Sequence, residues 1–375
     1  MKFKIIRDNF LKALLIASRI CPQKSTDPII TNLKIELLNT GLYLTGTNGI
    51  ISIRHYLPII LNDKQIIRDM VYGGILVNSF LLTEIIKRID GDEVSFEVID
   101  DSIVKIENEK SNFKLNGIRI EEFRDIDFDE EGARIVLLSK TFIETINQVS
   151  FAVSTKDNRP QLTAVNVESD TSCLVFTATD GARLARKELE VEVKEKLNSN
   201  IPGKTLQEVL RTITTENSIE FYISDKKVLF KLDNTLIQST LIAGDYPNTK
   251  NIIPKVSYYT LEVNSNELIN AMERVSLFSS EREFIVKLTM SENKVEVSSK
   301  SQQTGSGVET ITNFKYKGER LEISFNNEYV KSAIKALNCE DVTINFLGEM
   351  KPFTILNKND NSVIYTKNNA GEFVK

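Results

Sequence analysis

One pattern recurs three times along the 375 residues of this chain, at equal spacing. The copies cover residues 82–89, 206–213 and 330–337, so each begins 124 residues after the one before it. In each copy the first, fourth, fifth and eighth residues are apolar, which is the spacing of a helix with one face on a core. An apolar stretch precedes each helix, and an alternating stretch typical of a strand follows it. Two equal intervals indicate an internal repeat.

The rest of each repeat is built alike. A second helical segment opens each copy, at residues 10–14, 142–146 and 268–272, and period-2 runs typical of strands lie between the two helices. The turn at 45–49 is also similar to the turn at 177–181. The sequence therefore predicts an α+β fold of three tandem domains, each with two helices on antiparallel sheet. Their expected limits are 1–128, 129–254 and 255–375.

Composition excludes several classes of protein. Apolar residues make up 41% and charged residues 26%, as in an ordinary globular chain. One histidine and three widely separated cysteines leave no zinc-binding or Ser–His–Asp pattern, so we expect no metal and no cofactor. The first twenty residues follow helical spacing rather than that of a signal peptide, and no segment approaches the ~20 apolar residues of a membrane span. We expect a soluble, cytoplasmic protein without a membrane partner.

Tandem repeats of this kind constrain assembly. Copies related by a constant rotation form an arc, and an arc with complementary ends closes into a ring by head-to-tail association. Closure also removes the exposed sheet edges that would otherwise template aggregation. A linear rod of three domains is equally compatible with the repeat alone.

Several motifs together resemble one family. They are the opening Met1-Lys-Phe, the stretches at 27–34 and 44–48, residues 177–185, residues 244–248 with Ile253-Pro254, and residues 325–337. Their order, spacing and threefold repetition are similar to those of the bacterial DNA polymerase III beta subunit, the beta sliding clamp family, over essentially the whole length. The resemblance implies a DNA-clamp fold that closes as a dimeric six-domain ring.

The resemblance also implies a function. Such a ring is a head-to-tail homodimer that encircles duplex DNA without reading its sequence, and it is a processivity factor rather than an enzyme. It tethers the DNA polymerase III catalytic subunit, the clamp loader and other proteins that carry a clamp-binding motif. The alternative is a clamp paralogue with altered or lost partner recruitment.

Charge supports a DNA-facing helical surface. The six expected helices carry eleven basic and seven acidic residues, whereas the whole chain has a formal net charge of −5. Lys and Arg near phosphates bind duplex DNA without reading sequence. By position within the matching motifs, the expected DNA contacts are Lys24, Lys156, Arg159 and Lys204; ordinary solvated charges are the competing interpretation.

A partner pocket is implied beside the junction of the second and third domains. The matching positions are Leu162, Thr179, Gly181, Arg183, Leu184, Pro247, Ile252, Val363 and Tyr365. Plain core packing is the competing interpretation of Leu162, Leu184 and Ile252. The C-terminus departs from the family pattern, with Thr366 in place of a proline and Lys367 in place of an apolar residue. We therefore expect altered partner specificity.

The ring seam is expected to join a strand at 111–115 to one near 298–309, with apolar contact from Phe113 and Leu115. Residues 301–307 carry no charge, which predicts a dimer that is weaker or less salt-sensitive than usual.

An enzyme is the main competing class. Gly203-Lys204-Thr205 lacks the P-loop spacing, and Asp180 and Asp245 are interpreted as turn formers rather than Mg²⁺ ligands.

Overall fold

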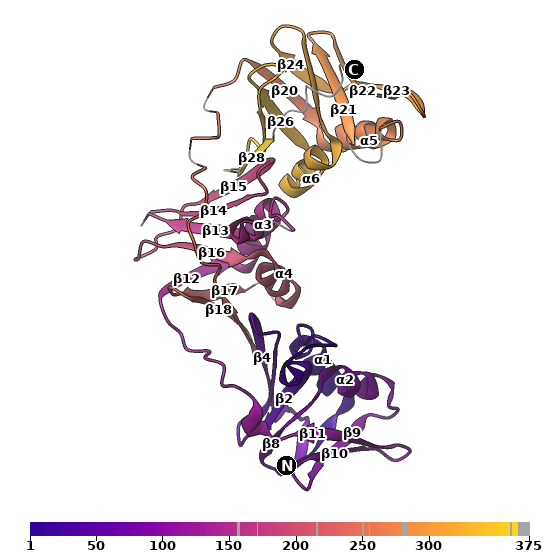
Figure 1. Ribbon diagram of the computed structural model, residues 1–375, viewed down its shortest axis with the longest axis vertical. Coiled ribbons are helices and arrows are strands. Elements are labelled where there is room, and N and C mark those ends of the chain that lie inside the picture. Colours follow the sequence, from indigo (N-terminus) through magenta and orange to yellow (C-terminus); the bar gives the residue numbers. More distant parts are fainter. Residues whose placement is uncertain are drawn as a thin grey trace. The chain divides into compact units, whose positions relative to one another are not determined.

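The structure is a computed structural model, and it describes residues 1–155, 158–170, 172–214, 217–249, 251–254, 256–279, 284–360 and 362–366. The chain forms two compact units (Figure 1). The first holds residues 1–139 and 207–241, and the second holds residues 140–206 and those from 242 onward. This division separates the two parts of the central repeat, so the expected domain limits near 128 and 254 stay a prediction.

The helices lie where the repeat predicts them. Those of the described residues are α1 (Arg7–Ala17), α2 (Ser79–Arg88), α3 (Ser139–Ser150), α4 (Gly203–Thr212), α5 (Ser265–Ser276) and α6 (Asn327–Leu337). Asparagine caps three of them: the side chains of Asn78, Asn264 and Asn326 accept a hydrogen bond from a backbone N–H of α2, α5 and α6. No described helix has both the length and the apolar character that a membrane crossing needs.

The first unit is built on one thirteen-stranded antiparallel sheet. Its strands, in order across the sheet, are β12 (Ala133–Leu138), β17 (Ser218–Ile223), β18 (Lys227–Leu232), β19 (Thr235–Thr240), β4 (Ile51–Pro58), β3 (Gly41–Thr47), β2 (Asn32–Leu37), β8 (Gly73–Asn78), β11 (Asn112–Ile118), β10 (Ile103–Glu107), β9 (Glu93–Ile99), β1 (Lys2–Ile6) and β7 (Ile67–Val71). A hairpin of β5 (Ile60–Leu61) and β6 (Lys64–Gln65) stands apart from it.

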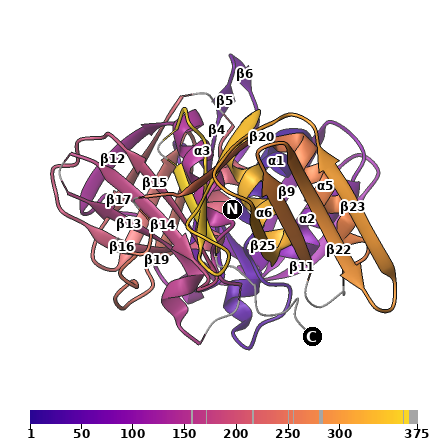
Figure 2. The ribbon, with the colours of Figure 1, turned by 90° about the horizontal axis from the view of Figure 1, so that it is seen from above.

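The second unit holds two sheets. The nine-stranded sheet has the order β16 (Asn198–Pro202), β13 (Ala164–Ser169), β14 (Leu174–Thr179), β15 (Arg183–Leu189), β28 (Ser362–Thr366), β27 (Phe353–Leu356), β26 (Asp341–Phe346), β20 (Tyr259–Asn264) and β24 (Phe314–Lys317). The four-stranded sheet has the order β23 (Gly305–Ile311), β22 (Lys294–Ser301), β21 (Ile285–Ser291) and β25 (Leu321–Asn326). Helix α5 packs on β22 and β23 (Figure 2).

Helices pair over the sheets, as the apolar stripes predict. In the first unit α1 packs against α2, and in the second α5 packs against α6. The stacked rings of Phe3 and Phe96 lie 5.0 Å apart between centroids, and the ring of Phe10 meets both edge-on. All three are fully buried in the core of the first repeat.

Neighbouring repeats share a sheet at two places. The first junction, between the first two repeats, is the antiparallel pair β4–β19, in which His55 lies opposite Thr235 and Arg54 opposite Leu236. The second junction, between the last two repeats, is the pair β15–β28. There Lys187 lies opposite Ser362 and Arg186 opposite Val363. In both cases the last strand of one repeat adds to the third strand of the core of the repeat before it.

Candidate functional site

A tight turn opens the second junction. The hydroxyl of Thr179 donates to the carbonyl of Arg183 over 2.6 Å, and the Asp180 carboxylate accepts from the backbone N–H groups of Ala182 and Arg183 over 2.9 and 3.0 Å. Gly181 sits between them at φ +89°, a conformation that strains any residue with a Cβ. The predicted role of Asp180 as a turn former is confirmed.

Arg183 is held by groups from two further elements. Its guanidinium lies 5.3 Å from the ring of Phe151, which follows α3, and 4.8 Å from the ring of Tyr329 on α6. It also donates to Asp180 over 3.0 Å and to the hydroxyl of Ser332 over 2.8 Å. A cation that contacts two rings and is hydrogen-bonded to two side chains has few free rotamers. The side chain therefore fixes the turn against the third repeat.

The second connector, residues 242–258, closes the other side of this turn. Its Tyr246 hydroxyl accepts a hydrogen bond from the backbone N–H of Thr179 over 2.9 Å, and burial raises the pKa of Tyr246. Ile252 of the same connector is 42% exposed, and Pro247 is exposed as well. An apolar side chain left in water beside a fixed turn is a feature of docking surfaces.

The structure places the predicted pocket residues as follows. Leu162 precedes β13 and is buried, as is Leu184 on β15, so both also serve the core. Val363 lies half-buried on β28, and Tyr365 is opposite Leu184 in the sheet, although its side chain lies outside the described part of the chain. Lys367 lies outside it too. All the other predicted positions gather on β14, β15 and the second connector.

Sequence reasoning missed the residues that hold Arg183. Phe151 lies far along the chain from Tyr329 and Ser332, which are both on α6, and a single sequence gives no sign that they meet. Tyr246 and Tyr329 both lie inside the quoted motifs at 244–248 and 325–337, so the resemblance contained them without assigning a role.

A nearly buried ion pair ties the two repeats together at the second junction. Lys187 pairs with Asp360, and their side chains are 11% and 17% exposed. Asp360 also accepts from the amide of Gln148 on α3 over 2.7 Å and from the hydroxyl of Ser362 over 2.7 Å. Burial lowers the pKa of Lys187. Because each charge is surrounded by partners, loss of one would leave the other unpaired in a site with little water.

The predicted DNA-contact residues that the structure describes are exposed. Lys24 lies between α1 and β2, Arg159 just before β13, and Lys204 in the first turn of α4. Lys156 lies outside the described residues. Within the described ranges, no ion pair reaches Lys24 or Lys204, so both charges face water.

The helices carry fewer free charges than their composition indicates. Many basic side chains on these helices, together with Arg19 just after α1, are in ion pairs: Arg7 with Asp8, Arg19 and Arg211 with Glu208, Lys87 and Arg88 with Glu84, Arg274 with Glu309, Lys331 with Glu328, and Lys335 with Glu273. In the part of the chain that the structure covers, Lys12 and Lys140 have no such partner. These two exposed lysines are additional candidates for contact with phosphate.

Several strand edges lack a described partner, and two of them belong to the strands of the first and last repeats that match those paired at the junctions. One is β23, the outer strand of its sheet; the other is β11 over residues 112–116, because β8 reaches only its last two residues. Apolar groups flank both: Phe113 on β11 is 39% exposed, Val308 on β23 is 62% exposed, and Leu277 after α5 is 77% exposed. A Cβ added at Gly307 would lie 2.7 Å from the ring of Phe278, which therefore rests on β23. The expected seam strand near 298–309 overlaps the end of the inner strand β22 and most of the outer strand β23, and the seam itself stays a prediction.

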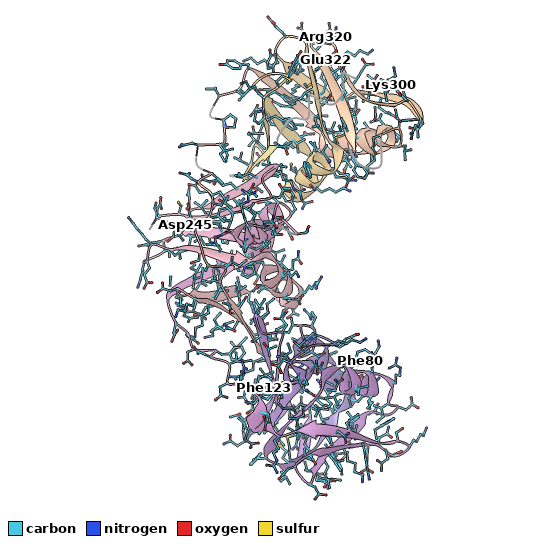
Figure 3. All side chains as sticks on the ribbon, in the orientation of Figure 1. Phe80, Phe123, Asp245, Lys300, Arg320 and Glu322 are labelled. Carbon is cyan, nitrogen blue, oxygen red and sulfur yellow. The ribbon has the colours of Figure 1, made fainter. Side chains whose placement is uncertain are left out.

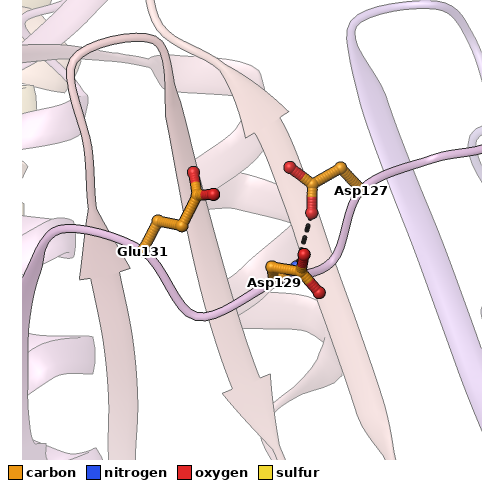
Figure 4. A group of neighbouring side chains, drawn as sticks. All are labelled: Asp127, Asp129 and Glu131. Carbon is orange, nitrogen blue, oxygen red and sulfur yellow. Dashed lines mark hydrogen bonds between the residues drawn. The ribbon is translucent and has the colours of Figure 1, made fainter.

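Carboxylates gather at one further place. Oxygens of Asp127, Asp129 and Glu131 lie within 4.8 Å of one another (Figure 4). Lys227 pairs with Asp127 and, over 3.3 Å, with Glu131, so a protein cation already balances this group. Asp245 is exposed on the surface of the second unit (Figure 3).

Tandem α+β repeats that continue one sheet into the next, with paired helices packed over the sheets of the first and last repeats, are the architecture of a three-domain DNA clamp. Three family models agree with this class. The DNA polymerase III beta subunit matches with its N-terminal domain over residues 1–127, its central domain over 136–248 and its C-terminal domain over 250–369.

Known relatives span the same length. The beta sliding clamp of Bacillus subtilis is 33% identical over 369 residues, covering 97% of this chain and 98% of its own. That of Staphylococcus aureus is 32% identical over 366 residues, 97% of each. The solved sliding clamp of Bacillus subtilis matches with a TM-score of 0.94 over 98% of each chain. The beta chain of Streptococcus pneumoniae matches at 28% identity with a TM-score of 0.92, over 98% of this chain and 99% of that one. The chain belongs to the DNA polymerase III beta subunit family, the beta sliding clamps.

Proposed function

We propose that this chain is a DNA sliding clamp: a non-catalytic ring that encircles duplex DNA and tethers the replicative polymerase to it. One observation carries the proposal. The same kind of strand pairing joins the first repeat to the second and the second to the third, and the two strand edges that would extend the series are unpaired.

The pairing rule predicts how the ring closes. At each junction the last strand of one repeat adds to the third strand of the core of another, β19 to β4 and β28 to β15. The strands left over are β11, the last of the first repeat, and β23, the third of the last core. They belong to the first and last repeats, and a head-to-tail dimer of six domains, in which each pairs with the other strand of a second copy, satisfies both edges. Phe113 and Leu115 would then meet the apolar groups around Val308.

Enclosure rather than base readout would hold the ring on DNA. Exposed lysines such as Lys24, Lys140 and Lys204 attract phosphates without fixing a register, so the ring is free to slide. Arg159 and Lys156 are further proposed contacts. With most helix charges already balanced by acids, we expect weak binding to open linear duplex and strong retention only by topology.

The partner site is proposed at the second junction. A short peptide with an apolar anchor would dock beside the turn at Thr179–Arg183, against Leu184, Ile252 and Val363. Its partners would be the polymerase III catalytic subunit, the clamp loader and other clamp-motif proteins. Apolar burial of ~25 cal/mol per Å², less the cost of ordering the peptide, suits partners that exchange.

Retention on DNA tests the proposal directly. The protein is loaded by its clamp loader onto nicked circular plasmid, and half of the sample is linearised before gel filtration. We expect retention on the circle and loss from the linear form. As a matched control, Phe113→Asp places a charge in the seam and should abolish retention without unfolding the chain. Equal retention on both DNAs would refute enclosure.

The alternative is a clamp paralogue with altered recruitment, which the departures at Thr366 and Lys367 favour. A titration of the replicative polymerase's clamp-motif peptide separates the two. Binding that depends on Leu184 supports the general clamp, whereas retention on circular DNA without peptide binding supports the paralogue.

A further inference from the structure

The first connector, residues 119–132, lies on the first junction through an aromatic side chain. Phe128 is 9% exposed and forms a small core of its own with Tyr222 and Leu229, against which Ile126 and Leu236 pack. The guanidinium of Arg54 on β4 lies 4.3 Å from the centre of the Phe128 ring. The ring therefore covers side chains from both strands of the junction, β4 and β19.

Carboxylates on both sides of this ring bind cations of the second repeat. Lys227 pairs with Asp127 and Glu131, while Lys231 pairs with Glu130 over 2.6 Å. The Tyr222 hydroxyl donates to Glu130 over 2.7 Å. The bonds from Lys231 and then Tyr222 lower the pKa of Glu130. The segment thus has the chemistry of a docked peptide, with one apolar anchor between acidic residues.

At both junctions an arginine on one strand lies opposite an aliphatic residue on the other, on the same face of the sheet. Arg54 faces Leu236 across the first, and Arg186 faces Val363 across the second. Directly opposite residues in antiparallel strands share one face of the sheet. Arg186 pairs with Glu188 over 3.1 Å, and Ile252 of the second connector is 42% exposed. The buried ring of Phe128 covers the first junction, whereas the proposed pocket residue Val363 is half-buried at the second.

We propose that the first connector is a built-in ligand, which fills at the first junction the place that the second junction offers to partner peptides. This rests on the proposed partner site at the second junction. A tethered segment acts at an effective concentration in the millimolar range, so it excludes free peptides of ordinary affinity. The first junction is thereby a closed counterpart of the partner pocket.

The proposed ligand of the first junction is a segment of this chain, so it can be added as a separate peptide. We would titrate a synthetic peptide with the sequence of residues 122–131 into the full-length protein and into its Phe128→Ala variant, by calorimetry. The variant should bind one peptide per chain about tenfold or more tightly than the wild type. The same peptide carrying Phe128→Ala is the control and should not bind. Equal binding by both proteins, or no binding by either, would overturn the proposal.

Hydrogen exchange tests the same idea without a variant. In the wild-type protein the amides around Phe128 in the first connector should exchange at least several-fold more slowly than those around Ile252 in the second, because Phe128 is buried and Ile252 is 42% exposed. Equally fast exchange in the two connectors would also overturn it.

Both readouts report on the first junction. Failure of the partner pocket would appear separately, as clamp-motif peptide binding that is unchanged in the Leu184→Ala variant, or as its absence in the wild type. A negative result for the connector therefore leaves the partner pocket standing, and the two failures are distinguished by which peptide fails to bind.

Discussion

The two junctions of this chain share their geometry and differ in their chemistry. At equivalent positions His55 donates or accepts a hydrogen bond with Thr235 over 2.8 Å at the first junction, while Lys187 pairs with Asp360 and contacts Ser362 over 3.3 Å at the second. Burial lowers the pKa of His55 to about 4, so the first junction is neutral there. The first is sealed by an aromatic connector, and the second is fixed by a buried charge pair. The same strand pairing is thus completed by different side chains at the two junctions, and the proposed docking surface lies at the second.

The turns before the two junctions are also alike. Thr47 and Asn48 bond the backbone around Gly49 in the way that Thr179 and Asp180 do around Gly181, and the two glycines have φ of +88° and +89°. In the first repeat an exposed Ile50 follows the glycine, whereas in the second the chain leads into the anchored Arg183. Both repeats contain the same turn, and they differ in the side chains that follow it.

The largest expected difference between the junctions comes from their ion pairs. Asp360→Ala should destabilise the protein by about 3 kcal/mol, because it leaves Lys187 buried without a counter-charge. Asp127→Asn at the first junction should leave the denaturant midpoint within experimental error, since Asp127 is exposed and its pairing is screened. Urea unfolding measures the loss of free energy of unfolding in both variants. Comparable losses would show that burial does not strengthen the pair at the second junction.

Acid should weaken the first junction before the second. The folded state holds the pKa of His55 at about 4, against 6.5 for the free side chain, so the unfolded state binds the proton more readily. The free energy of unfolding that neutral His55 contributes is fully present above pH 6.5. It falls as the pH is lowered toward 4, by about 1.4 kcal/mol per pH unit at most. Urea unfolding at pH 7 and pH 5 should show a loss of about 2 kcal/mol that His55→Gln removes. An unchanged slope in His55→Gln would place the titrating group elsewhere.

Part of this organisation was predictable from sequence and part was not. The helical stripes and the turns at 45–49 and 177–181 depend on local spacing, which a sequence displays directly. Helix α1 ends at Ala17 although the helical spacing continues to residue 20, and Pro22 then disfavours helical backbone at Cys21. The pairs β4–β19 and β15–β28, and the rings around Arg183, depend on contacts between distant segments. The same is true of the burial of His55.

Arg183 and Arg54 provide a matched pair for function. Arg183→Ala removes the stack with Phe151 and Tyr329 and the bond to Ser332, so the turn loses its anchor. We expect clamp-motif peptide to bind about tenfold more weakly, equivalent to about 1.4 kcal/mol. Arg54→Ala removes the stack on Phe128 and should leave peptide affinity unchanged. Calorimetric titration of both variants checks this, and equal weakening would move the pocket away from the second junction.

The smallest effect concerns the two glycines. Gly49→Ala and Gly181→Ala each force an L-residue into left-handed backbone, at a cost of about 1 kcal/mol in stability. Both should therefore lower the thermal midpoint to a similar extent. Peptide affinity should fall only for Gly181→Ala, because only that turn borders the proposed pocket. A fall in both would mean that the affinity loss follows from stability alone.

The pairing of each repeat with a strand from the next has a consequence for synthesis. His55 and Thr235 meet although 180 residues separate them in the chain. On the ribosome, β4 emerges long before β19 exists, so its hydrogen-bonding edge stays uncovered while the central repeat is translated. The nascent first repeat must therefore wait in an incomplete state, and slow translation through residues 60–235 would prolong its exposure to chaperones and to wrong partners.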